Sequence, residues 1–529
     1  MRVGVEVGGT FTDLVAIGED GITVTKVPSV PRQPDEGAFN ALLQSRIPIS
    51  SVEDLTHGST VATNAVLERK GFATAFITTQ GFRDILRLQR HGRSRIYDLE
   101  YVKPEPVVAR AACYEVSERI RADGSIQLAL DLDRVKQELV PVLRQGGYWA
   151  VAICLLNAYV NPAHEEALAS LLESELPDMQ VSLSSHVTRE FREFERASTT
   201  TLSAYVQPVV ERYIDRFVKR LEGEGFFGRF SVMQSNGGRL PAEAMQSSAI
   251  TALLSGPAAG VIGATRQAGR SGYQNLITFD MGGTSTDVCM VTAGKAQLTQ
   301  EYSIDGLPIR IPLIDIHTIG AGGGSVIWVD DGGMLRIGPH SSGADPGPAC
   351  YGRGGEQPTL TDAHVILNTV RPEAFLGGQM EIFANQSRSA MQPVAEQLGM
   401  SLEDAADSAI QLANANVVRA IQLISTERGF DPRDYVLVPF GGAGPLHAAS
   451  VASDLGISVV VVPPSAGVIS AFGLIASDFT QFSSLTRRVI VDNQAPDVVR
   501  EIYRVMRDEA MAKFETLKLK GDLVFDFIA

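Results

Sequence analysis

Two short stretches of the chain share one pattern of glycine, hydroxyl and carboxylate residues. Residues 3–17 read VGVEVGGTFTDLVAI and residues 277–291 read ITFDMGGTSTDVCMV, so the motif GGT-x-T-D occurs twice at an offset of 274 residues. Apolar runs flank both copies, which predicts a strand, a tight turn and a second strand in each. The duplication predicts two related units, each opening one α/β lobe.

The turn in each copy has the composition of a phosphate-binding loop. Consecutive backbone N–H groups form a concave anion site, and glycine lets a phosphate oxygen approach without a Cβ in its way. A single GGT turn is equally typical of a plain β-hairpin, whereas two matching turns favour a nucleotide site. The candidate nucleotide-binding residues are Gly8, Gly9, Thr10, Thr12, Gly282, Gly283, Thr284 and Thr286.

Carboxylates accompany both turns. When the two copies are aligned, Glu6 and Asp13 of the first copy match Asp280 and Asp287 of the second. They would repel a phosphate unless a cation lay between them. Magnesium, which prefers carboxylate, phosphate and water oxygens, is the natural cation. We expect Glu6 and Asp280 to be metal ligands, and Asp13, Asp280 and Asp287 to be the catalytic carboxylates.

A third glycine cluster lies in residues 436–447, VLVPFGGAGPLH, which predict a strand, a turn and the start of a helix. Gly441, Gly442 and Ala443 would let a flat adenine or ribose lie against the backbone. The alternative is an ordinary tight strand–helix turn. No GxxxxGK[ST] motif occurs, so the chain is not a P-loop enzyme.

Residues 314–325, IDIHTIGAGGGS, combine two possible ligands with a glycine-rich loop. Asp315 and His317 share one face of an expected short strand and are candidate metal or substrate ligands. Gly322 and Gly323 are candidates for holding the γ-phosphate. The alternative is a core histidine beside a tight turn.

Three further segments carry weaker signals. Residues 343–352, GADPGPACYG, predict a surface loop in which Cys350 is structural rather than nucleophilic. Residues 57–64 predict a helix start that either receives an anion or is simply capped. The basic run 83–95 predicts a solvated surface rather than a substrate or partner contact.

The composition narrows the function classes. The net charge is −15 and the pI about 5.1, which argues against nucleic acid as the partner. The four cysteines form no CxxC pair, so we expect neither disulfides nor a zinc site, and a cytoplasmic location. The absence of a long apolar run predicts no membrane span.

The 529 residues favour several domains, and strand and helix signals alternate along them, which favours an α/β class. We expect an N-terminal lobe over residues 1–190, a second lobe over 191–485 and the start of a C-terminal region over 486–529. The expected helices cover 59–70, 188–222, 400–428 and 494–518, and the expected strands include 73–78, 150–156, 435–439 and 457–462.

The motifs together resemble the hydantoinase A/5-oxoprolinase family, which includes N-methylhydantoinase subunits and the acetone carboxylase beta subunit, within the actin, hexokinase and heat-shock chaperone superfamily. The matching stretches run from about residue 3 to 475 and include VEVGGTFTDLV, THGSTVATNAVLERKG, REFERASTTTLSAYVQP, LLSGPAAGVIGA, FDMGGTSTDV, IDIHTIGAGGGSVIWVDDGG, GADPGPACYGRGG and VPFGGAGPLHA. Glu6 departs from the family's usual aspartate, which predicts an indirect metal contact there. Family members also continue well beyond residue 529, so we expect a missing C-terminal region.

The resemblance implies a two-lobed actin/hexokinase-like ATPase fold with duplicated phosphate-binding hairpins. It implies an ATP-dependent hydrolase subunit that phosphorylates the carbonyl of a cyclic amide, such as a hydantoin, 5-oxoproline or a lactam, for ring opening. It also implies a hetero-oligomer with a hydantoinase B-type subunit. The alternatives are an ATP-dependent ketone carboxylase subunit and a non-catalytic nucleotide-binding subunit.

Overall fold

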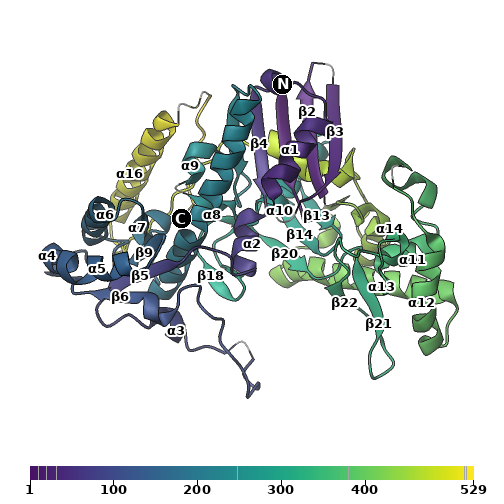
Figure 1. Ribbon diagram of the computed structural model, residues 1–529, viewed down its shortest axis with the longest axis horizontal. Helices are drawn as coiled ribbons and strands as arrows, with labels where there is room; N and C mark the ends of the chain where they lie inside the picture. The colour runs from purple at the N-terminus through teal and green to yellow at the C-terminus, as the bar shows by residue number, and fades with distance from the viewer. Residues whose placement is uncertain are drawn as a thin grey trace.

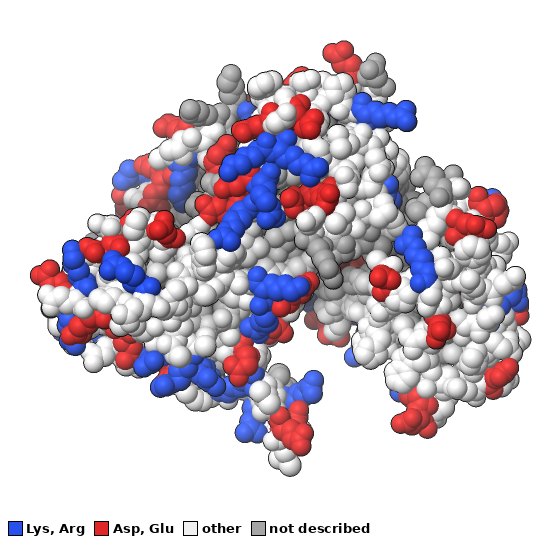
Figure 2. Space-filling view, viewed as in Figure 1, with Lys and Arg blue, Asp and Glu red and all other residues white. Residues whose placement is uncertain are grey.

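The computed structural model describes residues 1–528 except 10, 20, 31, 32, 94, 247, 379, 518 and 520. Figure 1 shows sheets and helices gathered into a left and a right half, with the strands of the N-terminal hairpin between them. Figure 2 shows that the surface is hollowed between these halves, and that Lys and Arg side chains on this face are interspersed with Asp and Glu.

A six-stranded sheet carries the first GGT hairpin. Its central strand β1 (Arg2–Val7) has five buried residues out of six, as expected for a strand with neighbours on both sides. It pairs in parallel with β4 and antiparallel with β2. The strand order is β12 (Arg239–Pro241), β11 (Arg229–Met233), β4 (Asp54–Ser59), β1, β2 (Phe11–Gly18) and β3 (Gly21–Pro28).

A four-stranded parallel sheet lies in the left half, with its own apolar core against α5 (Val140–Gln145) and α6 (Ala163–Glu175). Its two central strands are wholly buried, which is typical of a sheet covered on both faces. The order is β10 (Gln180–Leu183), β9 (Ala150–Cys154), β5 (Thr74–Thr79) and β6 (Cys113–Val116).

The second GGT hairpin opens the five-stranded sheet of the right half. β13 (Leu276–Met281) and β14 (Thr286–Thr292) form the hairpin, and β23 (Val436–Phe440) pairs in parallel with β13. β14 also pairs with β15 (Lys295–Ala296) and β20 (Ile316–Ile319). The predicted α/β class with duplicated hairpins is confirmed.

Long helices connect these sheets. α8 (Glu193–Gly223) crosses the left half, and α13 (Leu402–Ile424) packs its alanine-rich face into the right-hand core. Between the halves, α10 (Ser255–Arg270) crosses α15 (Ile469–Ala476) at a glycine contact, where a Cβ on Gly473 would lie 1.8 Å from the carbonyl oxygen of Ala259.

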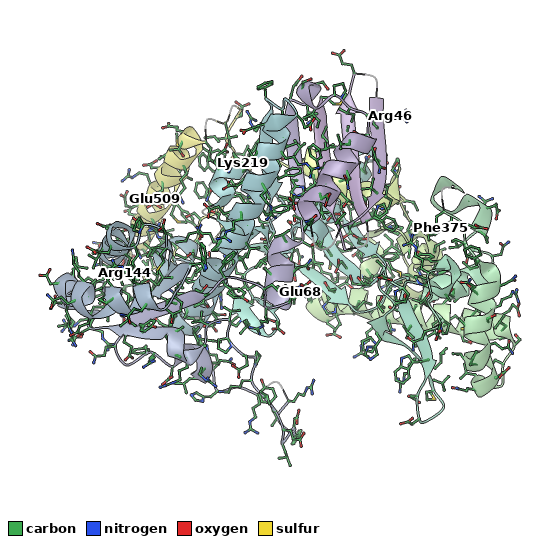
Figure 3. The ribbon with its side chains drawn as sticks, in the orientation of Figure 1. Arg46, Glu68, Arg144, Lys219, Phe375 and Glu509 are labelled. Atoms are coloured by element: carbon green, nitrogen blue, oxygen red, sulfur yellow. The ribbon has the colours of Figure 1, made fainter. Side chains whose placement is uncertain are left out.

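The C-terminal helix α16 (Ala495–Thr516) returns to the left half. Glu509, labelled in Figure 3, forms an ion pair of 2.8 Å with Arg189, which lies just before α8. Within the described residues, no helix is both long enough and apolar enough to span a bilayer.

Most of the expected helices and strands are present with shifted ends, but the prediction of one strand was wrong. α8 begins at Glu193 rather than 188, and the helix after β4, α2 (Val61–Leu67), is shorter than predicted. The strand expected over 457–462 is reduced to a single bridge between Leu437 and Val460. Its apolar run is held at the edge of the sheet by β23, and the chain turns away at Pro463 and Pro464, which cannot donate ladder hydrogen bonds.

Candidate functional site

The two GGT hairpins have the same register as well as the same sequence. Glu6 lies directly opposite Asp13 across β1 and β2. Asp280 lies directly opposite Asp287 across β13 and β14. Residues that face each other in an antiparallel pair project from the same side of the sheet, so each hairpin presents two carboxylates together.

The turns are closed by one equivalent hydrogen bond in each hairpin. The Gly8 amide donates to the Phe11 carbonyl at 3.0 Å, and the Gly282 amide donates to the Ser285 carbonyl at 3.0 Å. Gly9, Gly283 and Thr284 are exposed at the tips. Thr10 lies outside the described residues. These tips have the exposed backbone that a phosphate site requires.

The second threonine of each motif is turned into the fold. Thr12 is fully buried, and its hydroxyl lies 3.1 Å from that of Ser29. Thr286 is also fully buried and donates to the Ala321 carbonyl at 2.5 Å. Both face inward because strand residues alternate between the faces of a sheet, so they brace the turns instead of reaching a ligand.

The carboxylates of the two hairpins lie close enough to act on one another. Burial raises the pKa of Glu6 to about 8, and the charges of Asp13 and Asp280 add to that rise. Burial, followed by Asp287 and Asp13, raises the pKa of Asp280 to about 7. The fold therefore brings residues 274 positions apart into one acidic cluster, consisting of Glu6, Asp13, Asp280 and Asp287.

The remaining two carboxylates differ in their partners. Burial raises the pKa of Asp13, but Lys26 opposes this rise with an Nζ–Oδ1 contact of 2.6 Å. Burial raises the pKa of Asp287 to about 6, against a 2.6 Å hydrogen bond from the Thr318 hydroxyl. Lys26 lies on β3, next to the first hairpin, and supplies a cation to Asp13. Thr318 lies on β20, next to the second hairpin, and supplies a neutral hydroxyl donor to Asp287.

Lys26 was missed in the sequence, although a signal for it exists. Gly18 and Gly21 bracket a two-residue turn, so a hairpin there places residue 26 opposite residue 13. The structure has this pairing. The side chain of Lys26 is 28% exposed, so it is not closed off from solvent beside the acidic cluster.

The start of α10 was missed as well. A Cβ on Gly256, in the first turn of this 16-residue helix, would lie 2.6 Å from Oε1 of Glu6. The helix N-terminus carries unpaired N–H groups and a partial positive charge. The signal was a helix start at Ser255-Gly256-Pro257, within a stretch noted only for its family resemblance.

The third glycine cluster meets the second hairpin directly. Gly441 has φ of +79°, and a Cβ there would lie 2.1 Å from Oδ1 of Asp280. The Ala443 amide donates to the Met281 carbonyl at 2.9 Å. Gly442 has no atom within 4 Å of its Cβ position, so its face is open. The turn predicted for the adenosine therefore adjoins the acidic cluster.

The glycine-rich loop of residues 320–325 packs on the same hairpin. The Gly323 and Gly324 amides donate to the carbonyls of Gly282 and Gly283 at 2.9 and 2.7 Å. A Cβ on Gly322 would lie 2.8 Å from the Gly283 carbonyl carbon. The amides of Gly323 and Gly324 thus support the second GGT turn, whereas the Gly322 amide donates to the Ser325 hydroxyl at 2.8 Å.

Asp315 and His317 do not join the acidic cluster. Asp315 makes a short ion pair with Arg428, and His317 pairs with Val288 across the strands, one position away from Asp287. The described residues contain no group of three His, Cys, Asp or Glu side chains arranged to hold a metal. Asp315 is already neutralised, which speaks against its predicted role as a metal ligand.

The weaker signals proved structural. Cys350 is fully buried, and burial raises the pKa of its thiol, so the structural interpretation is confirmed. The helix start predicted within residues 57–64 is present, since α2 begins at Val61 after Thr60. His57 precedes it on β4, where it is buried between the Val5 carbonyl and the Tyr213 hydroxyl. In the basic run, Arg90 is held by both carboxylate oxygens of Glu195.

Comparison with known proteins agrees with this arrangement. Residues 196–482 match the family model for hydantoinase/oxoprolinase, and residues 2–176 match the model for the hydantoinase/oxoprolinase N-terminal region. Caprolactamase subunit alpha from Pseudomonas jessenii is 35% identical over 98% of this chain and 77% of its own length.

Two solved structures are similar over most of the chain. The ATP-dependent caprolactamase from Pseudomonas jessenii superposes with a TM-score of 0.88 at 34% identity, covering 99% of this chain and 77% of that one. Nucleotide-free acetone carboxylase superposes with a TM-score of 0.76 at 28% identity, covering 90% and 70%.

Proposed function

Because the chain belongs to the hydantoinase/oxoprolinase family, we propose that it is an ATP-dependent hydrolase subunit that activates the carbonyl of a cyclic amide for ring opening. The observation that carries the proposal is the meeting of both GGT turns, the Gly441 turn and four carboxylates at one place. The caprolactamase of similar fold is ATP-dependent, as this site would require.

The chemistry explains why such a reaction uses ATP. Amide resonance makes the ring carbonyl a poor electrophile. Transfer of the γ-phosphoryl group to the carbonyl oxygen forms an O–P bond, breaks the bond to ADP and converts that oxygen into a leaving group. Water can then attack the carbon, and the tetrahedral intermediate expels the ring nitrogen as an amine, which opens the C–N bond and leaves an acyl phosphate. A second water hydrolyses the acyl phosphate to a carboxylate and free phosphate. Phosphoryl transfer depends on positioning and charge neutralisation, which the turns, Lys26 and the start of α10 would supply.

The acidic cluster would take a divalent cation such as Mg²⁺ only together with the phosphates of the nucleotide, because the described side chains form no group of three arranged to hold a metal by themselves. The ligands that the cluster offers are carboxylate oxygens. Among the described residues, Lys26 is the cation in contact with the cluster, so the cluster has more negative than positive groups. Asp280 and Glu6 would hold the ion, partly through water, and Asp13 would support it. When bound, the ion would neutralise phosphate charge. Asp287, with Thr318 fixing its orientation, would position the nucleophile.

The nucleotide would span the three turns. The tips at Gly9 and Gly283 would receive phosphates, and the open face of Gly442 would receive the adenosine. In this proposal the lobes correspond to residues 1–190 and 191–485, and closure between them would exclude water from the phosphoryl group.

A ketone carboxylase subunit is the second candidate, favoured by the likeness to acetone carboxylase. Both activities would use phosphorylation to activate a weak electrophile. We also propose a partner of the hydantoinase B type, since the caprolactamase relative is called a subunit alpha. A cytoplasmic location fits the four unpaired, buried cysteines.

The test is ATP turnover with a panel of hydantoin, 5-oxoproline and ε-caprolactam, with and without a co-expressed hydantoinase B-type subunit. We expect at least one amide to stimulate ADP release and to be ring-opened in the presence of the partner. Stimulation only by a ketone with bicarbonate would replace the hydrolase with the carboxylase. If no compound changes ATP turnover in either setting, both enzymatic proposals fail and the nucleotide-binding role remains.

A further inference from the structure

A narrow slot with mostly apolar walls lies between the start of α10 and the segment that carries β19 (Leu313–Ile314) and β20. Among the described residues, none that line the slot is charged. The free space in it is about 10 Å³, room for one water-sized group, so a flat ring would insert only one edge. The lining includes Leu254, Pro257, Ile314, Ile316 and Thr318, with Tyr302 from β17 (Tyr302–Ile304).

The mouth of the slot adjoins the acidic cluster by direct contacts. Thr318, which is exposed there, donates its hydroxyl to Oδ1 of Asp287 at 2.6 Å. On the α10 side, Pro257 follows Gly256, whose Cβ position lies 2.6 Å from Oε1 of Glu6. Both walls therefore reach carboxylates of the cluster, and a group held in the mouth would lie beside the phosphates proposed for the GGT turns.

Two polar groups at the mouth have unused hydrogen-bonding capacity. Thr318 occupies Oδ1 of Asp287, and no donor among the described residues reaches Oδ2. The Tyr302 hydroxyl also has no hydrogen-bond partner in the part of the chain that the structure describes. Burial, and then the charge of Asp287, raise the pKa of Tyr302, so the phenol keeps its proton. A free acceptor and a free donor thus accompany the apolar slot.

Leu254 forms part of the slot at a cost to its backbone. Its φ is +57°, a left-handed value that is unfavourable for a residue with a Cβ and that glycine would adopt more easily. Its amide is held by the Thr63 hydroxyl at 3.0 Å. Strain of this kind concentrates at ligand sites. The leucine side chain, which supplies apolar surface to the slot, gives a reason for its presence at this position.

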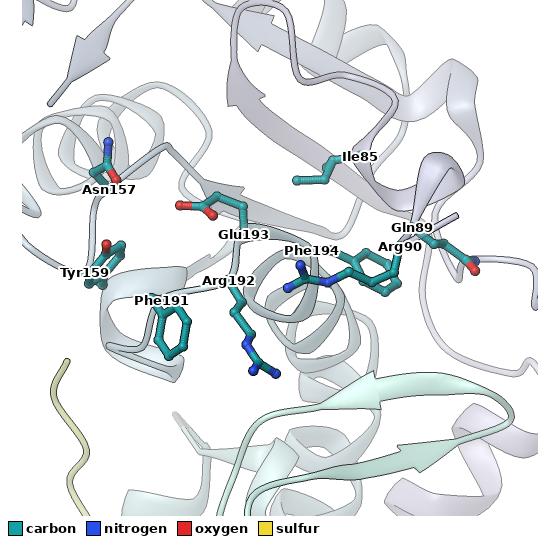
Figure 4. A pocket seen from close by; sticks show the side chains of 9 residues that line it. All are labelled: Ile85, Gln89, Arg90, Asn157, Tyr159, Phe191, Arg192, Glu193 and Phe194. Atoms are coloured by element: carbon teal, nitrogen blue, oxygen red, sulfur yellow. The ribbon is translucent and has the colours of Figure 1, made fainter. Parts of the chain in front are cut away.

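A wider pocket, of about 510 Å³, lies between α3 (Ile85–Leu88), the segment after β9 and the start of α8 (Figure 4). No residue of the GGT turns lines it, and two of its arginines are already paired, Arg90 with Glu195 and Arg192 with Glu301. Direct phosphoryl transfer requires the reacting atoms to approach within about 3 to 3.5 Å. The slot, which adjoins the acidic cluster, meets that requirement better than the wider pocket.

We propose that the slot binds the ring of an uncharged lactam, an inference that rests on the proposed hydrolase function. In a small lactam ring the amide is cis, so its N–H and C=O groups lie on the same edge. The N–H would donate to Oδ2 of Asp287, and the carbonyl oxygen would accept from the Tyr302 hydroxyl while keeping a lone pair for the phosphoryl group. The methylene groups of the opposite edge would enter the slot between Leu254 and Ile316.

The same arrangement would select against other amides. The carboxylate of 5-oxoproline would lose water without gaining a cation in the slot, and it would be repelled by Asp287. An open-chain trans amide presents its N–H and C=O groups on opposite edges, so it could not reach Asp287 and Tyr302 together. The slot would therefore determine specificity for an uncharged ring.

The experiment uses the full chain with its co-expressed partner subunit and compares ε-caprolactam, hydantoin and 5-oxoproline. Tyr302→Phe removes an unpaired hydroxyl and keeps the ring, and Leu254→Gly shortens a wall of the slot while suiting the left-handed backbone. The control is Phe191→Ala, since Phe191 is 49% exposed and lines the wider pocket instead. The KM for each amide, the KM for ATP, kcat and the thermal midpoint are measured for every protein.

We expect the wild type to have a kcat/KM for ε-caprolactam about tenfold or more above that for 5-oxoproline or hydantoin. Both slot variants should raise the KM for ε-caprolactam by about fivefold or more, with the KM for ATP and the thermal midpoint close to wild type. The control should change neither constant.

Three results would overturn the slot assignment and leave the hydrolase proposal standing. They are a wild-type preference for 5-oxoproline or hydantoin, a KM for ε-caprolactam that is unchanged or rises only in step with the KM for ATP in the slot variants, and a raised KM for ε-caprolactam in the Phe191 control. A wild type whose ATP turnover responds to no cyclic amide would instead overturn the hydrolase proposal, and the slot assignment would fall with it.

Discussion

The backbone of Gly441 lies against the carboxylate of Asp280. A Cβ on Gly441 would be 2.1 Å from Oδ1 of Asp280 and 2.6 Å from the Met281 carbonyl oxygen, and φ is +79°. The turn between β23 and α14 (Gly444–Leu455) therefore reaches the second hairpin only because this residue is glycine.

Gly441→Ala should lower the free energy of unfolding by about 2 kcal/mol or more, because the new Cβ meets backbone and the left-handed φ disfavours it. Nucleotide affinity should fall with it. Gly442→Ala is the matched control, since its Cβ position is open. Urea titrations in which both variants lose equal stability would contradict the packing described here.

Asp280→Asn should reduce ATP turnover by roughly 100-fold or more, because a charged group beside the phosphates is lost at constant shape. Without nucleotide the variant should be at least as stable as wild type at pH 8, since one of several repelling carboxylates is removed. Steady-state ADP release and thermal unfolding test the two parts. Normal turnover would exclude Asp280 from the phosphate site.

The nucleotide-free protein should lose stability as pH rises. Glu6 has a pKa raised to about 8 in the fold against an ordinary 4.5, so between these values the folded state binds more protons than the unfolded state. The unfolding free energy then falls with pH, by up to about 1.4 kcal/mol per unit for one such proton.

Glu6→Gln removes this titration and should flatten the slope between pH 5 and pH 8, as measured by urea unfolding in EDTA. A slope identical to wild type would contradict the raised pKa. Because a cation site needs the carboxylate form, binding of Mg²⁺ and ATP to the wild type should also strengthen as pH rises through about 7 and 8 and release protons.

Lys26→Met should raise the KM for ATP several-fold and raise the pKa of Asp13 further, because its cationic partner is lost. The effect on stability should stay near or below about 1 kcal/mol, since the pair is partly exposed. Lys26→Arg should restore part of the affinity. Lys295→Met, which breaks an exposed pair with Asp526, should leave KM unchanged. Equal kinetics in the Lys26 and Lys295 variants would remove Lys26 from the site.

Gly473→Ala should destabilise the protein by about 3 kcal/mol or more, because its Cβ would overlap the Ala259 carbonyl where α10 and α15 cross. Gly269→Ala, near the end of α10, has nothing within 4 Å of the new atom and should be neutral or slightly stabilising through helix propensity. Calorimetric scans that rank the two variants in the opposite order would refute the close helix contact.

The amino-acid sequence by itself determined the hairpins and their register. Strand periodicity and glycine turns act over a few residues, so the duplicated motif was enough to predict that each hairpin carries two carboxylates. The same local reasoning could have placed Lys26 opposite Asp13. It also found the α/β class and the glycine turn at residue 441.

Only the tertiary structure decided which of these groups meet. The contact of Gly441 with Asp280 and the pairing of Asp315 with Arg428 each depend on segments far apart in the chain. Exposure, pKa and pocket shape arise from packing between distant elements, and local sequence patterns do not encode which distant elements come together.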